Sequence, residues 1–186
     1  MILTTKRLLL RDFVESDWEA VLAYQRNPLY LRYNEWTERT PEAVRDFIRM
    51  FLDHQEQKPR LKFQFAVTLK STGQLIGNCG VRRASVDAYE GDIGYELDPD
   101  HWNKGYGTEA AQAILHFGFT QMNLHRISAQ CVAENIGSAH VLEKLGMQQE
   151  GRFRENLYLK DRWWDTILYA ILYHEWQTRS DNLSFE

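Results

Sequence analysis

The spacing of hydrophobic residues changes at Lys62, where a helical pattern gives way to one typical of strands. Before that point, hydrophobic side chains recur every three or four positions, as on one face of a helix: Val44, Phe47, Ile48, Phe51 and Leu52. In front of them, Thr40-Pro41-Glu42 supplies a capping residue, a proline suited to a first turn and an acid near the positive end of the helix dipole. We therefore predict a helix that begins at Thr40-Pro41 and ends before Pro59.

From Lys62 onward, hydrophobic residues occupy every second position, which is the period of a half-buried strand. The alternating residues are Phe63, Phe65, Val67 and Leu69. Turn-forming residues follow at Ser71–Gly73, and Leu75–Arg83 is again apolar, with Gly77 and Gly80 marking a bulge or a close backbone approach. This arrangement predicts a β-hairpin.

Hydrophobic spacing and turn residues define the remaining elements in the same way. We predict strands at Arg7–Asp12, Asp87–Leu97, Arg126–Val132, Gly151–Leu159 and Arg162–Leu172. We predict helices that begin at Ser16-Asp17 and that cover Thr108–Gln121 and Ser138–Leu145. Leu29–Arg39 is expected to be a loop over a cleft, and the chain after Trp176 a frayed tail. Helical crossovers between hairpins indicate an α/β fold with a mixed sheet.

Length and composition fit one domain, which we place at residues 1–176, followed by a C-terminal tail at 177–186. Hydrophobic residues make up 44% and aromatic residues 13% of the chain, which favours a filled core over disorder. The formal net charge of -4 argues against nucleic-acid binding as the main task.

The N-terminal sequence and the two cysteines are those expected of a cytoplasmic protein. Charges at Lys6, Arg7 and Arg11 leave no room for the apolar centre of a signal peptide. No run of about 18 apolar residues is present, so we expect no membrane association. Cys79 and Cys131 lie in apolar, strand-like runs, as expected of buried thiols in a reducing compartment.

A glycine-bearing loop precedes the helix predicted at Thr108–Gln121. In Lys104-Gly105-Tyr106-Gly107-Thr108, glycines allow backbone amides to approach an anion, and the helix dipole attracts negative charge. A pyrophosphate suits such a site, although an ordinary loop has the same composition. Gly105–Ala110 also satisfies the dinucleotide fingerprint, but no buried strand stands directly before it. The sequence of a Walker loop is absent.

These motifs, taken in order, resemble the GCN5-related N-acetyltransferase (GNAT) family, and within it the RimJ/RimL-type branch that acetylates ribosomal-protein N-termini. The resemblance covers nearly the whole chain. Besides the glycine loop, it rests on Thr5-x-Arg7-Leu8-x-Leu10-Arg11, Ile93–Leu97, Leu124–Ile127, Asn135-x-x-Ser138, Leu142–Met147, Gln149–Gly151 and Trp164-Asp165.

The resemblance implies a GNAT fold: a mixed, mostly antiparallel twisted sheet with helices on both faces and a V-shaped opening between the two central strands. It implies that acetyl-CoA lies in the V and that its pantetheine pairs with backbone at Tyr95–Leu97. Asn135 would bind the pantetheine arm, and Ser138 would face the thioester sulfur. Backbone amides would hold the pyrophosphate, and they belong to Asn103, Lys104, Gly105, Tyr106, Gly107 and Thr108.

Two positions depart from the family pattern. Trp102 stands where the family often has Gln or Arg, a change that backbone binding tolerates. Leu142 stands where the family often has a tyrosine general acid, which leaves Ser138 as the donor to the departing thiolate. A thiol pKa of about 8.5 means that this thiolate needs little acid assistance.

Several carboxylates are candidates for the general base. Glu96, which we expect at the mouth of the V, is the first choice and Glu155 the second, with water alone as a third route. Acids cluster in sequence near the expected mouth and would either attract a cationic substrate or form a polar edge: Asp87, Glu90, Asp92, Glu96, Asp98 and Asp100.

The predicted function is direct acetyl transfer from acetyl-CoA to a primary amine, most simply a protein N-terminal α-amine. The alternatives are an acetyltransferase for a small amine and a catalytically silent acyl-CoA-binding module. Cys131 could carry an acetyl group as a thioester, but a buried structural thiol fits its mid-strand position. No metal site is expected, and the chain would act as a monomer or a homodimer.

Overall fold

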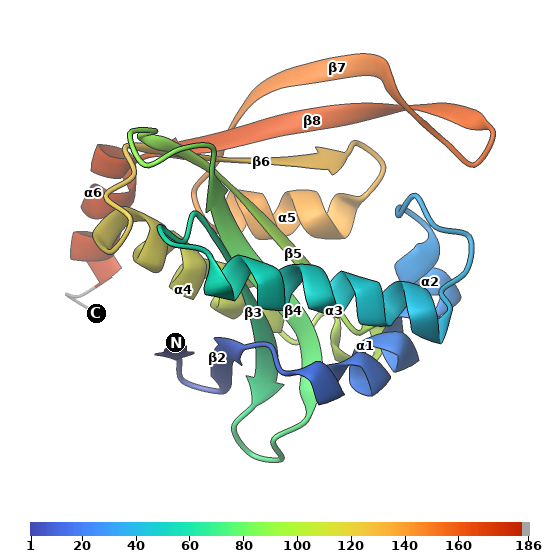
Figure 1. Ribbon diagram of the computed structural model, residues 1–186. Coiled ribbons are helices and arrows are strands. Elements are labelled where there is room, and N and C mark those ends of the chain that lie inside the picture. Colours follow the sequence, from blue (N-terminus) through green and yellow to red (C-terminus); the bar gives the residue numbers. More distant parts are fainter. Residues whose placement is uncertain (184–186) are drawn as a thin grey trace.

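The computed structural model describes residues 1–183, which form one eight-stranded sheet in the order β1-β2-β3-β4-β5-β6-β8-β7 (Figure 1). The strands are β1 (Ile2–Thr4), β2 (Leu8–Asp12), β3 (Lys62–Leu69), β4 (Leu75–Arg83), β5 (Glu90–Leu97), β6 (Arg126–Val132), β7 (Gln148–Leu159) and β8 (Arg162–Leu172). All neighbouring strands are antiparallel except β5 and β6. The predicted mixed, mostly antiparallel sheet is confirmed.

Helices cover both faces of this sheet, as predicted. They are α1 (Trp18–Gln25), α2 (Pro28–Leu31), α3 (Pro41–Glu56), α4 (Tyr106–Thr120), α5 (Ile136–Lys144) and α6 (Tyr173–Leu183), with short 3-10 turns η1 (Glu15–Asp17) and η2 (Pro99–His101). Figure 1 shows α3 in front of β3 and β4, and α4 behind them. None of the helices in the described part of the chain is long and apolar enough to span a membrane.

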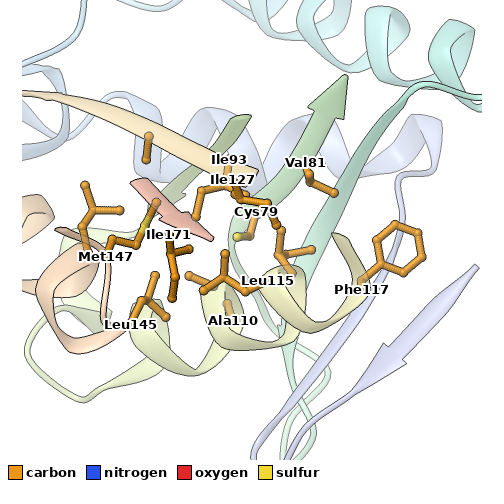
Figure 2. Close-up of a cluster of buried hydrophobic side chains, with 14 of the residues drawn as sticks. Cys79, Val81, Ile93, Ala110, Leu115, Phe117, Ile127, Leu145, Met147 and Ile171 are labelled. Carbon is orange, nitrogen blue, oxygen red and sulfur yellow. The ribbon is translucent and has the colours of Figure 1, made fainter. Parts of the chain in front are cut away.

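The alternation of β3 distributes its side chains between two cores. Phe65 and Val67 face the core under α4, whereas Ala66 between them faces the core under α1 and α3. Figure 2 shows the first core, where Ala110 and Leu115 of α4 lie near side chains from the central strands. Full burial of a large aliphatic or aromatic side chain stabilises a fold by about 1.5–3 kcal/mol, so this layer fixes α4 against the sheet.

The start of α3 follows from its sequence signals. The Thr40 side chain accepts a hydrogen bond from the Ala43 backbone N–H at 3.2 Å, with Pro41 in the first turn. Val44 and Ile48 are buried on the predicted face. The prediction for this helix is confirmed, with its end at Glu56.

Short or terminal elements were not predicted. β1 has three residues and α2 has four, and both lie below the length at which periodicity can be recognised. The prediction of a frayed tail after Trp176 is wrong as far as Leu183, because α6 continues to that residue. Positions 184–186 of the predicted tail lie outside the described residues, and the domain limit at residue 176 stays a prediction.

The parallel strands β5 and β6 pair over only three positions: Glu90–Arg126, Gly91–Ile127 and Asp92–Ser128. Beyond Asp92, β5 continues to pair with β4 and β6 continues to pair with β8, but not with each other. The two strands therefore separate towards Leu97 and Val132, as Figure 1 shows. This separation is the predicted V-shaped opening.

The last hairpin ends the sheet with β7 as an edge strand. Its tip turns at Lys160-Asp161, as predicted, and both residues have positive φ angles of 52° and 58°. The pairing of β7 with β8 is interrupted twice, between Gln149 and Gly151 and between Phe153 and Leu157. β7 is thus long but irregular.

Candidate active site

The end of β5 presents backbone groups to the V. The Asp98 N–H donates to the Ile76 carbonyl at 2.8 Å, which makes these two residues a hydrogen-bonded antiparallel pair. Hydrogen-bonded pairs alternate along an antiparallel ladder, so the backbone groups of Tyr95 and Leu97 point away from β4. This is the strand edge at which the family resemblance implies that the pantetheine binds.

Gly77 of β4 allows this end of β5 to come close. A Cβ atom at position 77 would lie 2.2 Å from the Glu96 carbonyl oxygen and 2.9 Å from the Leu97 Cα. Both are backbone atoms, so neither can swing aside. The pairing of β3 with β4 shifts at the same level, between Val67 and Thr68, which confirms the predicted irregularity.

Trp102 connects the glycine loop to β5. Its indole Nε1 donates to the Leu97 carbonyl at 2.9 Å. The departure from the family pattern at this position therefore has a structural role: the indole fixes the loop at the end of the strand and occupies the Leu97 carbonyl.

The first turn of α4 has backbone geometry of the kind expected for an anion site. Gly105 is the residue before the helix and has a left-handed φ of 79°, a conformation in which glycine carries no steric cost. Within residues 1–183, the N–H groups of Tyr106, Gly107 and Thr108 make no hydrogen bond, because the first turn lacks helical acceptors. These unpaired amides suit a phosphate group.

Gly107 has a packing role in addition to the predicted one. A Cβ at this position would meet Leu97 Cδ1 at 3.1 Å and Val141 Cγ2 at 3.6 Å, so it would point towards α5 and β5. This glycine lets the helix pack tightly between the two arms of the V.

Arg7 holds the glycine loop from the opposite end of the chain. Its Nη1 donates to the Lys104 carbonyl at 2.9 Å, its Nε bonds Glu109 at 2.6 Å, and its guanidinium lies 4.4 Å from the Tyr106 ring centre. Burial tends to raise the pKa of Glu109, but hydrogen bonds from Thr5 and Arg7 outweigh it and keep the pKa below its ordinary value. The Thr5-x-Arg7 motif is therefore a clamp on this loop.

The second arm of the V carries Ser138 at the start of α5. Asn135 caps this helix, its side-chain oxygen accepting from the Ser138 N–H at 3.2 Å. That oxygen is therefore occupied, and the amide nitrogen of Asn135 is the group available to a ligand. Ser138 also contacts Cys131, whose thiol pKa is raised mainly by burial.

Tyr95 joins the two arms. Its hydroxyl lies 3.0 Å from the Ser138 Oγ and donates to the Ser138 carbonyl, also at 3.0 Å. Burial raises the pKa of Tyr95, so the phenol is neutral at physiological pH and acts as a donor. The sequence predicts only the backbone of Tyr95 as a site feature; the contact of its side chain with Ser138, 43 positions away, has no sequence signal.

Glu96 is the centre of a polar cluster between β5 and the first helices. Its Oε1 accepts from Tyr24 at 2.6 Å, Gln25 at 2.9 Å and Asn78 at 2.6 Å. Its Oε2 accepts from Tyr30 alone, at 2.6 Å. Burial, followed by the charge of Glu96, raises the pKa of both tyrosines, so both are neutral donors. Only Oε2 retains capacity for a further hydrogen bond.

Other predicted carboxylates lie elsewhere. Glu155 is exposed on β7, where its N–H donates to Asp165 at 2.9 Å, and no described contact joins its side chain to Glu96. The predicted acidic mouth is wrong for Glu90 and Asp92, which lie at the paired end of the V and bond arginines. Their parallel pairing with β6 places Glu90 and Asp92 at the closed end of the V. Their closeness to Glu96 in the sequence did not indicate this position.

Leu142 is buried in the core, so the position at which the family often has a tyrosine general acid carries an apolar packing residue. Within residues 1–183, no group of His, Cys, Asp and Glu side chains is arranged to hold a metal ion.

The segment from Leu29 to Trp36, part of the loop predicted to lie over a cleft, contacts the last hairpin. The Tyr33 hydroxyl donates to the Glu134 carbonyl at 2.9 Å, and its ring packs edge-on against Trp164 at 5.8 Å. The Lys160 ammonium donates to the Leu31 carbonyl. Segments 30–36 and 158–164 thus meet beside the open end of the V.

Comparison with known proteins gives a consistent result. The acetyltransferase (GNAT) domain family matches residues 7–148. The "Uncharacterized N-acetyltransferase YnaD" of Bacillus subtilis is 40% identical over 95% of this chain and 99% of its own. An acetyltransferase (GNAT family) structure from Bacillus anthracis, 36% identical, superimposes with a TM-score of 0.82 over 94% of this chain and 99% of that one.

Two further matches differ in the acceptor that their names give. The ribosomal-protein-S5-alanine acetyltransferase of Vibrio fischeri is 27% identical, with a TM-score of 0.81 over 95% of this chain and 98% of that one. The spermidine N(1)-acetyltransferase of Vibrio cholerae is 23% identical over 94% of this chain and 98% of its own.

Proposed function

The chain belongs to the GNAT family of acetyltransferases, and on that premise we propose that it transfers acetyl from acetyl-CoA directly to a protein N-terminal α-amine. The observation that carries this proposal is the V, which opens between a free strand edge at Tyr95–Leu97 and Ser138. The acceptor class is supported by the 27% identity to the S5-alanine acetyltransferase.

Acetyl-CoA is held in the V by backbone groups. The pantetheine pairs with the free edge of β5, and the side-chain amide of Asn135 donates to the same arm. The pyrophosphate lies on the unpaired amides of the first turn of α4, and the Arg7 clamp keeps that turn in place. Because these contacts are mostly backbone, they tolerate Trp102 in place of Gln or Arg.

The neutral amine attacks the thioester carbon and forms a tetrahedral intermediate. The Leu97 N–H donates to the developing oxyanion, since it points into the V. When the C–S bond breaks, the Ser138 hydroxyl donates to the thiolate, and Tyr95, which donates to the Ser138 carbonyl and touches the Ser138 Oγ, holds that hydroxyl in place. Its raised pKa keeps the proton on Tyr95, so Tyr95 orients Ser138 rather than supplying the proton itself.

The amine must lose a proton, and Glu96 Oε2 receives it, directly or through water. Oε2 is the carboxylate oxygen with spare capacity. An α-amine has a pKa of about 7.7–8.0, so a modest base is sufficient. Cys131 takes no covalent part, because burial raises its thiol pKa and keeps it protonated.

We expect the protein to acetylate the α-amine of short peptides when incubated with acetyl-CoA, with mass spectrometry locating the group at the N-terminus.

Acetyl-CoA alone should raise the melting temperature of the protein, because a ligand that binds only the folded state stabilises it by RT ln(1 + [L]/Kd). NADH should not. Stabilisation by acetyl-CoA without turnover of any amine would favour the silent module, and turnover of spermidine but of no peptide would favour the small-amine alternative.

Replacing Tyr95 with phenylalanine should lower kcat about 3–10-fold, with KM for acetyl-CoA nearly unchanged. The ring and its packing are kept, and one neutral hydrogen bond of about 0.5–1.5 kcal/mol is lost. Initial rates at saturating acceptor measure this change, and Tyr89→Phe, at a side chain 71% exposed, is the control.

A double-mutant cycle separates positioning from general structural damage. If Tyr95 acts through Ser138, the Tyr95→Phe/Ser138→Ala variant should be no slower than Ser138→Ala alone. Multiplicative losses in kcat would show that Tyr95 acts independently of Ser138.

A further inference from the structure

A groove with a cationic lining lies between α1, α2, the segment that precedes α3 and the tip of the last hairpin. Its volume is about 670 Å³. It is lined by four cationic residues, Arg26, Arg32, Arg39 and Lys160, and by one acid, Glu38. The groove is thus positive in a chain whose formal net charge is -4.

Arg39 is the strongest indication that the groove is built to bind an anion. Arg39 is only 7% exposed, yet it forms no ion pair with any residue in the range 1–183. Its guanidinium lies 4.0 Å from the Trp36 ring centre and donates to Gln25 Oε1 at 2.8 Å. A buried charge without a directly paired carboxylate is costly, so the arrangement retains a cation where packing alone would favour a neutral side chain.

The other cations of the groove are also held by neutral partners. Arg26 donates to the Arg39 carbonyl at 3.3 Å, Arg32 lies 5.1 Å from the Tyr33 ring centre, and Lys160 donates to the Leu31 carbonyl. None of them forms an ion pair with another described residue, whereas arginines elsewhere do, among them Arg11, Arg60 and Arg126. The groove therefore keeps its positive charge available.

This groove is joined to the proposed acceptor site through Gln25 and α2. The Gln25 side chain accepts from Arg39 and donates to Glu96 Oε1 at 2.9 Å. Tyr30, which bonds Glu96 Oε2, directly precedes the groove residue Leu31. An acceptor chain whose amine lies at Glu96 thus has the groove beside it on the other side of α2.

We propose that the groove binds the carboxylates of an acidic N-terminal segment, so that the substrates are peptides or proteins with acids soon after the reactive amine. This inference rests on the proposed N-terminal acetylation and specifies its substrate class. Three surplus positive charges would repel a polyamine and attract a polyanionic peptide. The acids of β5 do not offset this preference, because Glu90 and Asp92 are paired with arginines at the closed end of the V.

The test compares peptides that share one N-terminal residue and differ only in Asp against Asn at the following positions. Wild-type kcat/KM should be about tenfold higher for the Asp peptide at low ionic strength, and the ratio should shrink as salt is raised to roughly 0.15 M. Arg32→Glu and Lys160→Glu, both at exposed positions, should lower kcat/KM for the Asp peptide more than for the Asn peptide, so that the ratio disappears or inverts. Arg49→Glu makes the same charge change on the exposed face of α3 and should preserve the ratio.

A binding measurement keeps this test independent of catalysis. A fluorescent Asp peptide with a blocked, N-acetylated terminus cannot react, but it should bind wild-type protein more tightly than it binds the Arg32→Glu variant, as measured by anisotropy. Equal kcat/KM for Asp and Asn peptides, or equal effects of Arg32→Glu and Arg49→Glu, would overturn the proposal. So would binding of a short RNA by the groove with no binding of the blocked peptide. If spermidine but no peptide is acetylated, the proposed function fails, and the blocked peptide still decides whether the groove binds acidic chains.

Discussion

The Glu96→Ala variant is expected to melt about 10 °C below the wild type and to lose nearly all activity. The substitution leaves two buried tyrosines, Gln25 and Asn78 without their common acceptor. Removing one side of a buried charged network costs roughly 3–5 kcal/mol, and each kcal/mol shifts the melting temperature of a domain of this size by about 2–4 °C. Thermal unfolding followed by circular dichroism measures the loss.

The Glu96→Gln variant distinguishes a structural role of Glu96 from a role as general base. Its side-chain oxygen can still accept from Tyr24, Gln25 and Asn78, so its melting temperature should lie closer to that of the wild type. If Glu96 takes the proton of the amine, the loss of kcat/KM should be largest at low pH, where the amine is protonated. The loss should shrink as pH rises past about 8.

A pH-independent loss in Glu96→Gln would assign Glu96 to the scaffold alone, with water as the proton acceptor. Glu155→Gln is the matched control, because that carboxylate is exposed on β7. A pH-dependent loss in the control instead would move the base to the last hairpin.

Replacing Gly77 with alanine should weaken acetyl-CoA binding at least tenfold and destabilise the fold. The new methyl group would lie 2.2 Å from the Glu96 carbonyl oxygen, so β4 and β5 would have to separate at the open end of the V. Overpacking of this kind costs about 1–3 kcal/mol, and it displaces the Leu97 N–H that faces the ligand. Isothermal titration with CoA measures the affinity.

Gly151→Ala provides the comparison for this substitution. A Cβ there meets no atom within 4 Å, so stability should change by no more than about 0.5 kcal/mol. Normal CoA affinity in Gly77→Ala would mean that the end of β5 is not the pantetheine edge.

The central strands were predictable because their sequences alternate strongly and turn residues bound them. β4, β6 and β8 have the predicted limits, and both β3 and α3 follow the hydrophobic spacing. β5 begins at Glu90 rather than Asp87, and β7 begins at Gln148 rather than Gly151. In both cases the first residue of the strand is set by pairing with a neighbouring strand. The local hydrophobic spacing carries no information about that partner.

The side-chain contacts of the site were much less predictable. The glycine loop and Ser138 are visible in the sequence as motifs, whereas the partners of Glu96 are separated from it by 18 to 72 positions. Nothing in the local sequence of Tyr24 or Tyr30 marks either as a donor to a carboxylate on β5. Their meeting is a consequence of the packing of α1 against β4 and of α2 against α1.

The interrupted pairing of β7 has a consequence for association between copies of the chain. A long edge strand exposes a row of unpaired backbone groups on which another strand can be added, and such addition begins many aggregates. In β7, the two register shifts divide this row into short stretches, and the edge carries charged side chains: Glu150, Arg152, Arg154 and Glu155. At the opposite edge, β1 offers only three residues. Neither edge strand therefore offers a long, continuous row of unpaired backbone groups to an incoming strand. The sheet resists fibril-like growth at both edges.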